Sequence, residues 1–250
     1  VLLKENVRNP GTAIEFLNKK EILYRDIHDN RFLITFSKIF ISLNDDKLEE
    51  APISLLGIPL GFSLQRHHFQ VLHGSCVAID GGAICFIGES ASGKSSIALS
   101  LITKGFKLIT EDLCLVKDNE VYSFSSWIKT DQKNLLAELD IKEKLAIKKD
   151  SRNREYYKLA NRHASSKNVK LKAIYLLRNE KKREIVKVNQ FDAFKYLFTY
   201  AYRSHDADVE GLRKLTKICG SVDCFFYSRN TEDQVSENTK YLFEHLETIL

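Results

Sequence analysis

The feature that most constrains this chain is a glycine-bounded loop that directly follows an apolar segment. Residues 83–88 read AICFIG, and Gly88 opens the stretch GESASGKSS. The stretch fits the pattern G-x-x-x-x-G-K-[ST], in which backbone N–H groups and the N-terminus of the following helix surround a phosphate. Apolar residues at helical spacing follow the loop: Ile97, Ala98, Leu101 and Ile102. A strand, a phosphate loop and a helix in this order predict an α/β fold that binds a nucleotide.

Every residue of the loop is a candidate for contact with the nucleotide. These residues are Gly88, Glu89, Ser90, Ala91, Ser92, Gly93, Lys94, Ser95 and Ser96. Lys94 is expected to reach the β- and γ-phosphates, and the Ser95 hydroxyl is expected to ligate Mg²⁺. The pattern therefore predicts Mg²⁺ as the cofactor and ATP, or another nucleoside triphosphate, as the phosphate donor. A structural glycine turn is the alternative interpretation.

The composition narrows the class of protein. The chain has 250 residues, of which 44% are hydrophobic and 28% are charged, as in ordinary soluble domains. No apolar run approaches the roughly 18 residues of a membrane span, and the first ten residues are too charged for a signal peptide. The net charge of +5 is far from the dense basic stripe of a nucleic-acid binder. The five cysteines form no C-x-x-C pair and are expected to be buried, reduced thiols. We therefore expect a cytoplasmic protein with neither nucleic acid nor membrane as a partner.

The pattern of strands and helices predicts one domain over residues 1–250, with a β-rich N-terminal portion (1–70) and a nucleotide-binding core (71–250). Residues 21–37 are typical of a hairpin with a polar HDN turn, and Asp80–Gly82 of a tight turn between two strands. We expect the charged stretch 131–149 to be helical. The last sixty residues predict the order helix, helix, strand, helix, with Phe191 facing inward and a capping box at Thr231 and Gln234.

Two carboxylates end the strand that follows the loop helix. Residues 106–110 read FKLIT, and Glu111 and Asp112 come next. Phosphoryl transfer needs carboxylates for the metal ion and for the acceptor hydroxyl. We assign Asp112 to the metal ion, together with Ser95, and Glu111 to the hydroxyl proton. The reverse assignment stays open, and so does a solvated turn pair without function.

The stretch from His73 to Val116 resembles the core of the HPr kinase/phosphorylase family, whose fold is related to that of phosphoenolpyruvate carboxykinase. That family has a histidine that opens the strand pair, a G-x-S-x-x-G-K-S loop and an L-x-x-D-D strand. Here His73 precedes Ser95 by 22 residues and Glu111 follows it by 16, as in the family pattern. The resemblance implies a P-loop kinase core of this type, within an α/β fold that has a mixed sheet and a β-rich N-terminal portion. It also implies catalytic roles for Glu111, Asp112, His73 and Lys94, although His73 by itself reads equally as a strand-end histidine.

The chain also departs from the family pattern. Glu111 stands where the family has its first aspartate, and only Gly211 and Gly220 follow Gly105, so the family's downstream glycine-rich signature is absent. The region before His73 is too short for the separate N-terminal domain of the full-length bacterial enzymes. The chain is therefore more similar to stand-alone HPr-kinase-related proteins. These include lasso peptide kinases, which phosphorylate a C-terminal serine of a precursor peptide.

The resemblance thus implies an ATP-dependent kinase that phosphorylates a hydroxyl, with a serine of a ribosomal, lasso-type precursor peptide as the acceptor. The alternatives are a kinase of a free amino acid or sugar hydroxyl and a non-catalytic nucleotide-sensing module. A homo-oligomer is compatible with each of these three functions. Basic clusters at 142–154 and 178–183 are typical of solvated faces, and the alternative is a site for an acidic peptide. Arg152, Arg154 and Arg203 are the candidates for contact with the substrate or the phosphate.

Overall fold

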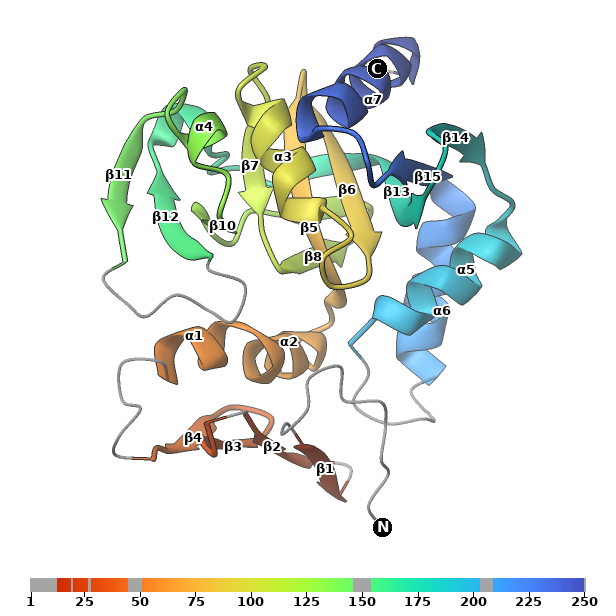
Figure 1. Cartoon of the computed structure of the whole chain (residues 1–250). Helices are drawn as coiled ribbons and strands as arrows, with labels where there is room; N and C mark the ends of the chain where they lie inside the picture. Colours follow the sequence, from red (N-terminus) through yellow and green to blue (C-terminus); the bar gives the residue numbers. More distant parts are fainter. Residues whose placement is uncertain are drawn as a thin grey trace. The chain divides into compact units, whose positions relative to one another are not determined.

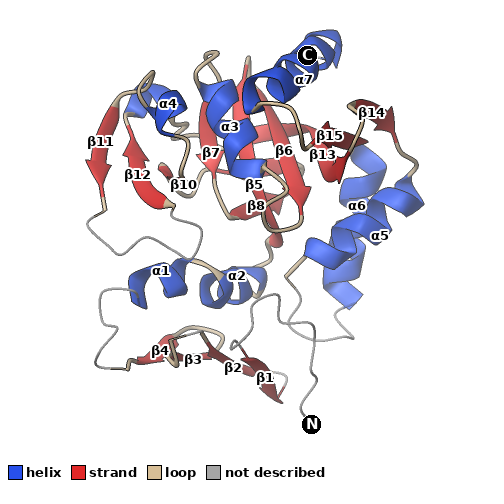
Figure 2. Cartoon of the chain, viewed as in Figure 1, coloured by secondary structure: helices blue, strands red, loops and turns tan. Residues whose placement is uncertain are grey.

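The computed structural model of the chain describes residues 13–18, 20–26, 28–44, 51–145, 154–202 and 209–249. Within these ranges the chain forms two compact units (Figure 1). The first unit contains Val1–Val71 and Tyr202–Leu212, and the second contains Leu72–Ala201 and Arg213–Leu250. Both units contain strands and helices (Figure 2), so the prediction of an α/β fold is confirmed.

The first unit is an antiparallel sheet with two short helices. Its strands follow one another in chain order: β1 (Ala13–Asn18), β2 (Glu21–Arg25), β3 (Arg31–Ile34) and β4 (Ile39–Ser42). The helices are α1 (Ala51–Leu56) and α2 (Ile58–Gln65). Alternate residues of β2 and β3 point to the same face of the sheet, and Ile22, Tyr24, Phe32 and Ile34 are buried with Phe62 of α2. The predicted β-rich N-terminal portion is therefore confirmed.

The predicted polar turn joins β2 to β3. The Asp26 carboxylate accepts hydrogen bonds from the backbone N–H groups of His28 and Asn30 at 2.8 and 2.9 Å. Asp29 has a φ of 62°, a left-handed conformation that aspartate tolerates better than most residues. Because the turn satisfies its own backbone donors, it sets the register in which β2 pairs with β3.

The second unit is built on an eight-stranded mixed sheet in the order β14-β15-β13-β6-β5-β8-β9, with β7 paired to β5. The strands are β5 (Gln70–Ile79), β6 (Gly82–Gly88), β7 (Lys107–Thr110), β8 (Leu113–Lys117), β9 (Glu120–Tyr122), β13 (Val169–Glu180), β14 (Glu184–Lys187) and β15 (Asp223–Asn230). β6 and β15 run parallel to β13, whereas β5 is antiparallel to β6. The predicted mixed sheet is confirmed, and so is the tight turn after β5, where Gly81 has a φ of 77°.

Helices cover both faces of this sheet (Figure 1). They are α3 (Lys94–Ile102), α5 (Gln190–Tyr200), α6 (Val209–Ser221) and α7 (Val235–Ile249). Ile84 and Phe86 of β6 are buried with side chains of α3 and α7, and Cys85 and Ile87 of the same strand are buried with side chains of α5 and α6. Each such apolar side chain contributes roughly 1.5–3 kcal/mol when it is fully buried. This two-sided burial holds the end of β6, and with it the glycine loop, in place.

A small three-stranded sheet packs beside α3. It consists of β10 (Trp127–Thr130), β12 (Glu155–Leu159) and β11 (Ile141–Lys144), with the short helix α4 (Lys133–Leu136) and a 3₁₀ turn at Asn161–His163. The expectation of a helix across 131–149 is therefore wrong in part, because only α4 is helical and β11 is extended; residues 146–149 lie outside the described ranges. Pairing with β12 satisfies the backbone groups of β11 and overrides the local composition.

Two details of the C-terminal helices also differ from expectation. Phe191 is 65% exposed, because Ala193, Leu197 and Tyr200 form the buried face of α5. The final helix begins at Val235, and the Glu237 carboxylate accepts the backbone N–H of Gln234 at 3.3 Å. The capping interaction therefore lies one turn later than the predicted pair of Thr231 and Gln234.

All five cysteines are buried and free, as expected. No helix in the described ranges combines the length and the apolar character that a bilayer crossing requires.

Candidate active site

The glycine loop leaves the sheet at the end of β6 and enters α3 at Lys94. Gly88 must be a glycine, because an added Cβ would lie 3.0 Å from the carbonyl oxygen of Leu177 and 2.9 Å from Ser92 Oγ. Gly93, the last residue before α3, has a φ of 90°, which residues with a Cβ rarely adopt. The two glycines thus let the loop lie close to the sheet and turn its backbone toward the start of α3.

Lys94 lies folded against its own loop. Its side-chain ammonium donates hydrogen bonds to the backbone carbonyls of Gly88 at 2.9 Å and Glu89 at 2.7 Å, and the residue is only 6% exposed. These two bonds compensate the burial of the charge. A phosphate in the loop would offer the same ammonium a charged acceptor, and charged acceptors form stronger hydrogen bonds than carbonyls do.

The two carboxylates occupy a strained turn between β7 and β8. The backbone N–H of Leu113 donates to the carbonyl of Glu111 at 2.9 Å, and Asp112 between them has a φ of 64°. A three-residue turn with a positive φ at its centre is rare and strained. The surroundings hold this turn, since the Asp112 carbonyl accepts the backbone N–H of Gly74 at 3.2 Å. Backbone strain of this kind clusters at functional sites.

Glu111 connects this turn to the loop. The Ser95 hydroxyl donates to Glu111 Oε1 at 2.5 Å, and Glu111 is 9% exposed. Burial, and then the neighbouring Asp112 carboxylate, raise the pKa of Glu111 to about 8. A carboxyl group that titrates in this range can exchange a proton near neutral pH.

Asp112 has the opposite electrostatic environment. Burial would raise its pKa, but the Lys129 ammonium, 3.3 Å from Oδ2, and then His73 hold the pKa of Asp112 well below its usual range. His73 Nδ1 lies 3.2 Å from the Asp112 carbonyl oxygen. Since a carbonyl oxygen only accepts, the imidazole would carry its proton on Nδ1. At a pH at which Glu111 is still protonated, Asp112 is therefore already ionised.

The structure brings together most of the residues that the sequence singled out. Ser95, Glu111, Asp112 and His73 form one cluster through the contacts given above, and Lys94 lies close enough to lower the pKa of Asp112. Arg154 lies close enough to lower the pKa of Glu111. Within the loop, Ser92 is buried and Ser96 half-buried, whereas Glu89, Ser90 and Ala91 are exposed. Arg152 and Arg203 lie outside the described residues.

Comparison with known protein families matches the part of the chain that holds this cluster. Residues 65–142 match the family model described as HPr Serine kinase C-terminal domain. The segment is HPr kinase-related. The match includes β5, the loop, α3 and both carboxylates, and it ends before β13.

Curated relatives show the same likeness over a short stretch. An HPr kinase/phosphorylase of Chloroherpeton thalassium is 41% identical over 49 residues, which are 20% of this chain and 14% of that protein. An HPr kinase/phosphorylase of Clostridium beijerinckii is 47% identical over 47 residues, 19% of this chain and 16% of that protein. The matched stretch thus spans about a sixth of the length of these relatives.

A solved structure of the Hpr(Ser) kinase/phosphatase from Coxiella burnetii is also similar. It matches 72% of this chain and 97% of its own, with 10% identity and a TM-score of 0.38.

Two cations of this site were not predicted from the sequence. Lys129 of β10 is paired with Asp112, and Arg229 of β15 lies against Gly93, where an added Cβ would be 2.5 Å from the guanidinium carbon. Lys129 shares its strand face with Trp127, opposite the buried Ile128 and Thr130, so the alternation along β10 gave no signal for it. Arg229 had no signal either, because its neighbours in sequence show no motif.

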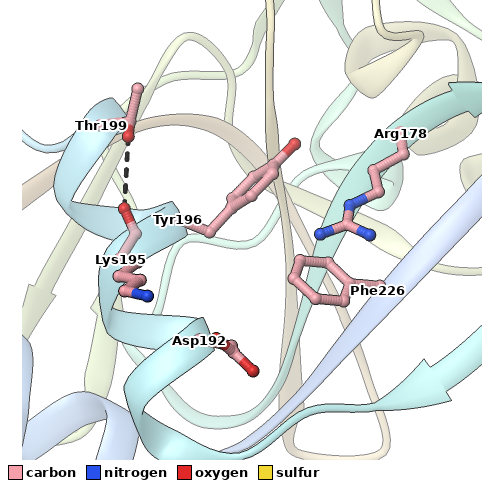
Figure 3. Close-up of a pocket in the computed structure, with 6 residues that line it drawn as sticks. All are labelled: Arg178, Asp192, Lys195, Tyr196, Thr199 and Phe226. Atoms are coloured by element: carbon pink, nitrogen blue, oxygen red, sulfur yellow. Dashed lines mark hydrogen bonds between the residues drawn. The ribbon is translucent and has the colours of Figure 1, made fainter.

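A pocket of about 430 Å³ opens on the α5 side of the sheet near the loop. Figure 3 shows its lining residues: Arg178, Asp192, Lys195, Tyr196, Thr199 and Phe226. The Arg178 guanidinium lies 3.3 Å from the centre of the Phe226 ring. The Tyr196 hydroxyl donates to the Leu177 carbonyl at 2.5 Å, and the same carbonyl lies against Gly88, which places the pocket beside the loop. Stacked aromatic and cationic groups of this kind suit a planar or anionic ligand.

Proposed function

We propose that this chain is an ATP-dependent kinase that transfers the γ-phosphate to a hydroxyl group. The observation that carries the proposal is the hydrogen bond between Ser95 and Glu111, because it joins the glycine loop to the carboxylate pair of the β7–β8 turn. A module that only binds a nucleotide needs the loop but has no use for a strained turn that places two carboxylates beside it. The match of residues 65–142 to the HPr kinase C-terminal domain supports the same chemistry.

The residues of the loop fit a nucleotide and a magnesium ion. The backbone N–H groups of Gly88–Ser96 and the start of α3 would hold the phosphates, and Lys94 would exchange its two carbonyl partners for phosphate oxygens. Ser95 and Asp112 would hold Mg²⁺, and in the described ranges no group of three His, Cys, Asp or Glu side chains competes for a metal ion. Mg²⁺ typically takes one or two carboxylates together with phosphates and water. When bound, it would neutralise charge on the phosphates.

The contrast between the two carboxylates supports separate roles. Glu111 has a pKa of about 8, so a fraction of it is ionised near neutral pH and can accept a proton, whereas Asp112 stays ionised and suits a cation. In the transfer, the bond from the γ-phosphorus to the oxygen bridging it to the β-phosphate breaks, and a bond to the acceptor oxygen forms. The acceptor proton passes to the ionised carboxylate of Glu111, helped by His73, and ADP leaves. Positioning and charge neutralisation supply most of the catalysis in such reactions.

For the acceptor, we propose a serine of a ribosomally made precursor peptide of the lasso type. The resemblance to stand-alone HPr-kinase-related proteins and the missing glycine-rich signature support a flexible acceptor rather than folded HPr. Arg154, close to Glu111, could attract an acidic segment of such a peptide. Attraction of this kind is screened over about 8 Å at physiological salt. A peptide acceptor therefore predicts a KM that rises with ionic strength and with Arg154→Glu, while kcat changes little. A KM that changes neither with ionic strength nor with Arg154→Glu would favour a small-molecule acceptor.

The test is the consumption of ATP with candidate peptides and metabolites, with mass spectrometry to detect the added phosphate. Lys94→Ala should remove transfer and keep the fold, since the change leaves the loop glycines in place. Lys240→Ala removes an exposed lysine of α7 and serves as the charge-matched control. Normal turnover in Lys94→Ala would refute the assignment.

A further inference from the structure

An arginine on the far side of the loop from the carboxylates has no role in the site described so far. Arg229 is the next-to-last residue of β15, and β15 lies two strands from β6 on the side opposite β5 and β7. Its guanidinium reaches Gly93, since a Cβ added at Gly93 would lie 2.5 Å from Arg229 Cζ. The absence of a side chain at Gly93 is therefore what allows the guanidinium to lie at the start of α3.

The positive charge of Arg229 is not compensated by a carboxylate. Its Nη2 donates to the side-chain oxygen of Asn179 at 3.0 Å, which is a neutral partner. Its Nε is buried and has no hydrogen-bond partner among the residues that the structure describes. No carboxylate in the described ranges comes within ion-pair distance of this guanidinium, whereas Arg183 in the turn between β13 and β14 pairs with Asp233 at 3.0 Å. A half-buried cation without a counter-ion is costly unless an anion binds to it.

The neighbourhood of Arg229 offers further donors to an anion. The first N–H groups of α3 have no partners within the helix, and the helix N-terminus carries a partial positive charge. Ser92 of the same loop is 1% exposed, and its hydroxyl has no hydrogen-bond partner in the described part of the chain. The first N–H groups of α3, the Ser92 hydroxyl and the Arg229 guanidinium thus belong to, or lie against, the same Gly88–Lys94 loop, and a phosphate group accepts several such bonds at once.

We propose that Arg229 is a phosphate-contacting residue of the kinase, whose guanidinium binds a phosphate oxygen of the nucleotide held by the Gly88–Ser96 loop. The inference rests on the proposed function and deepens it. Lys94 and Arg229 would then neutralise the phosphates from two sides, while Glu111 and Asp112 face the acceptor and the metal ion from a third. Arginine suits this place because its planar guanidinium fork gives two parallel bonds to one phosphate in a fixed geometry, whereas a lysine ammonium acts as a point charge.

The experiment measures nucleotide affinity in the full chain by calorimetry. Wild type, Arg229→Ala, Arg229→Lys and the control Lys240→Ala are titrated with Mg-ADP and with a Mg-bound ATP analogue whose β–γ bridge is an imido group. Arg229→Ala should raise the Kd about 10- to 100-fold, as expected for a lost hydrogen bond between charged groups. The Kd of Arg229→Lys should lie between those of wild type and Arg229→Ala. Lys240→Ala should bind both ligands with the wild-type Kd. If only the affinity for the triphosphate analogue falls, Arg229 contacts the terminal phosphate. If the affinities for both ligands fall equally, Arg229 contacts an inner phosphate.

The inference and the proposed function fail in different ways. Wild-type affinity in both Arg229 variants, with binding lost in Lys94→Ala, would overturn the role of Arg229 and leave the nucleotide site standing. A wild-type chain that binds neither ligand would overturn both. Thermal unfolding without nucleotide shows whether Arg229→Ala disturbs the fold. If it does, the Arg229→Lys variant decides, because it keeps the charge and most of the volume but loses the planar fork.

Discussion

At the scale of single residues, Glu111 and Asp112 are neighbours in sequence with opposite electrostatic environments. Glu111 is 9% exposed and has a serine hydroxyl as its hydrogen-bond partner, whereas the side chain of Asp112 is 31% exposed and paired with Lys129. The left-handed backbone at Asp112 turns the two side chains to different partners. One strained turn therefore places a protonatable carboxyl and a permanent carboxylate beside the same loop.

The raised pKa of Glu111 predicts a pH-dependent stability in the protein without metal ion or nucleotide. The folded chain keeps a proton on Glu111 up to about pH 8, whereas the unfolded chain releases it near its ordinary pKa. The free energy of unfolding should therefore fall as pH rises through this window, by up to about 5 kcal/mol. The Glu111→Gln side chain does not titrate, so this variant should not lose stability in this way. Its free energy of unfolding relative to wild type should therefore increase from pH 5 to pH 8.

Urea unfolding in EDTA at several pH values measures the difference. Glu244→Gln, which changes an exposed glutamate of α7, should follow the wild-type curve. Parallel curves for Glu111→Gln and wild type would show that burial at Glu111 does not favour the protonated form.

The two carboxylates should also separate in kinetics. Asp112→Asn should raise the Mg²⁺ concentration needed for half-maximal transfer, because it removes a charged ligand. Glu111→Gln should lower kcat about 100-fold or more, as the loss of a general base does, and should nearly keep the affinity for Mg-nucleotide. Calorimetry and steady-state rates test both variants. Loss of Mg-nucleotide binding in Glu111→Gln, with binding kept in Asp112→Asn, would mean that the roles are reversed.

At the scale of elements, local sequence predicted the parts whose stability is local. The β2–β3 turn, the tight turn after β5 and the strand-to-helix loop each contain the residues that their backbone conformation requires. The helix expected at 131–149 was wrong over β11, because β12 supplies backbone partners that local composition does not reveal. The inward face of α5 was misplaced for a similar reason: the sheet decides which of several aromatic residues is buried, and Phe191 is not.

The β5–β6 hairpin offers a prediction with a control in the same element. A Cβ at Gly74 of β5 would collide with Ile87 Cδ1 and lie 2.5 Å from the carbonyl oxygen of Phe86, whereas a Cβ at Gly81 in the turn would meet no atom within 4 Å. Gly74→Ala should therefore destabilise the protein by about 1–3 kcal/mol. Gly81→Asn should cost about 0.5 kcal/mol or less, because asparagine tolerates the left-handed turn. Urea unfolding compares the two, and an equal cost would contradict the packing argument.

At the scale of the whole molecule, the contacts that complete the site join segments far apart in sequence. Arg229 reaches Gly93 only because β15 lies parallel to β13 and β13 lies parallel to β6. Lys129 reaches Asp112 only because β10 belongs to the small sheet beside α3. A motif search finds residues with short, regular spacing, such as Gly88, Gly93 and Lys94. It cannot find partners whose proximity depends on the order of strands in a sheet.

The division into two units predicts a selective response to nucleotide. The loop, both carboxylates and Arg229 all belong to the second unit, so a bound nucleotide stabilises that unit by mass action. At 100 times the Kd the stabilisation is about 2.7 kcal/mol. Hydrogen exchange with and without Mg-nucleotide should therefore slow in β6 and α3 and stay unchanged in β2 and β3. Lys94→Ala should abolish the slowing, which separates binding from a general effect of salt. Equal slowing in β2 and β3 would mean that the two units unfold as a single cooperative body, and a site in the second unit would then stabilise the first as well.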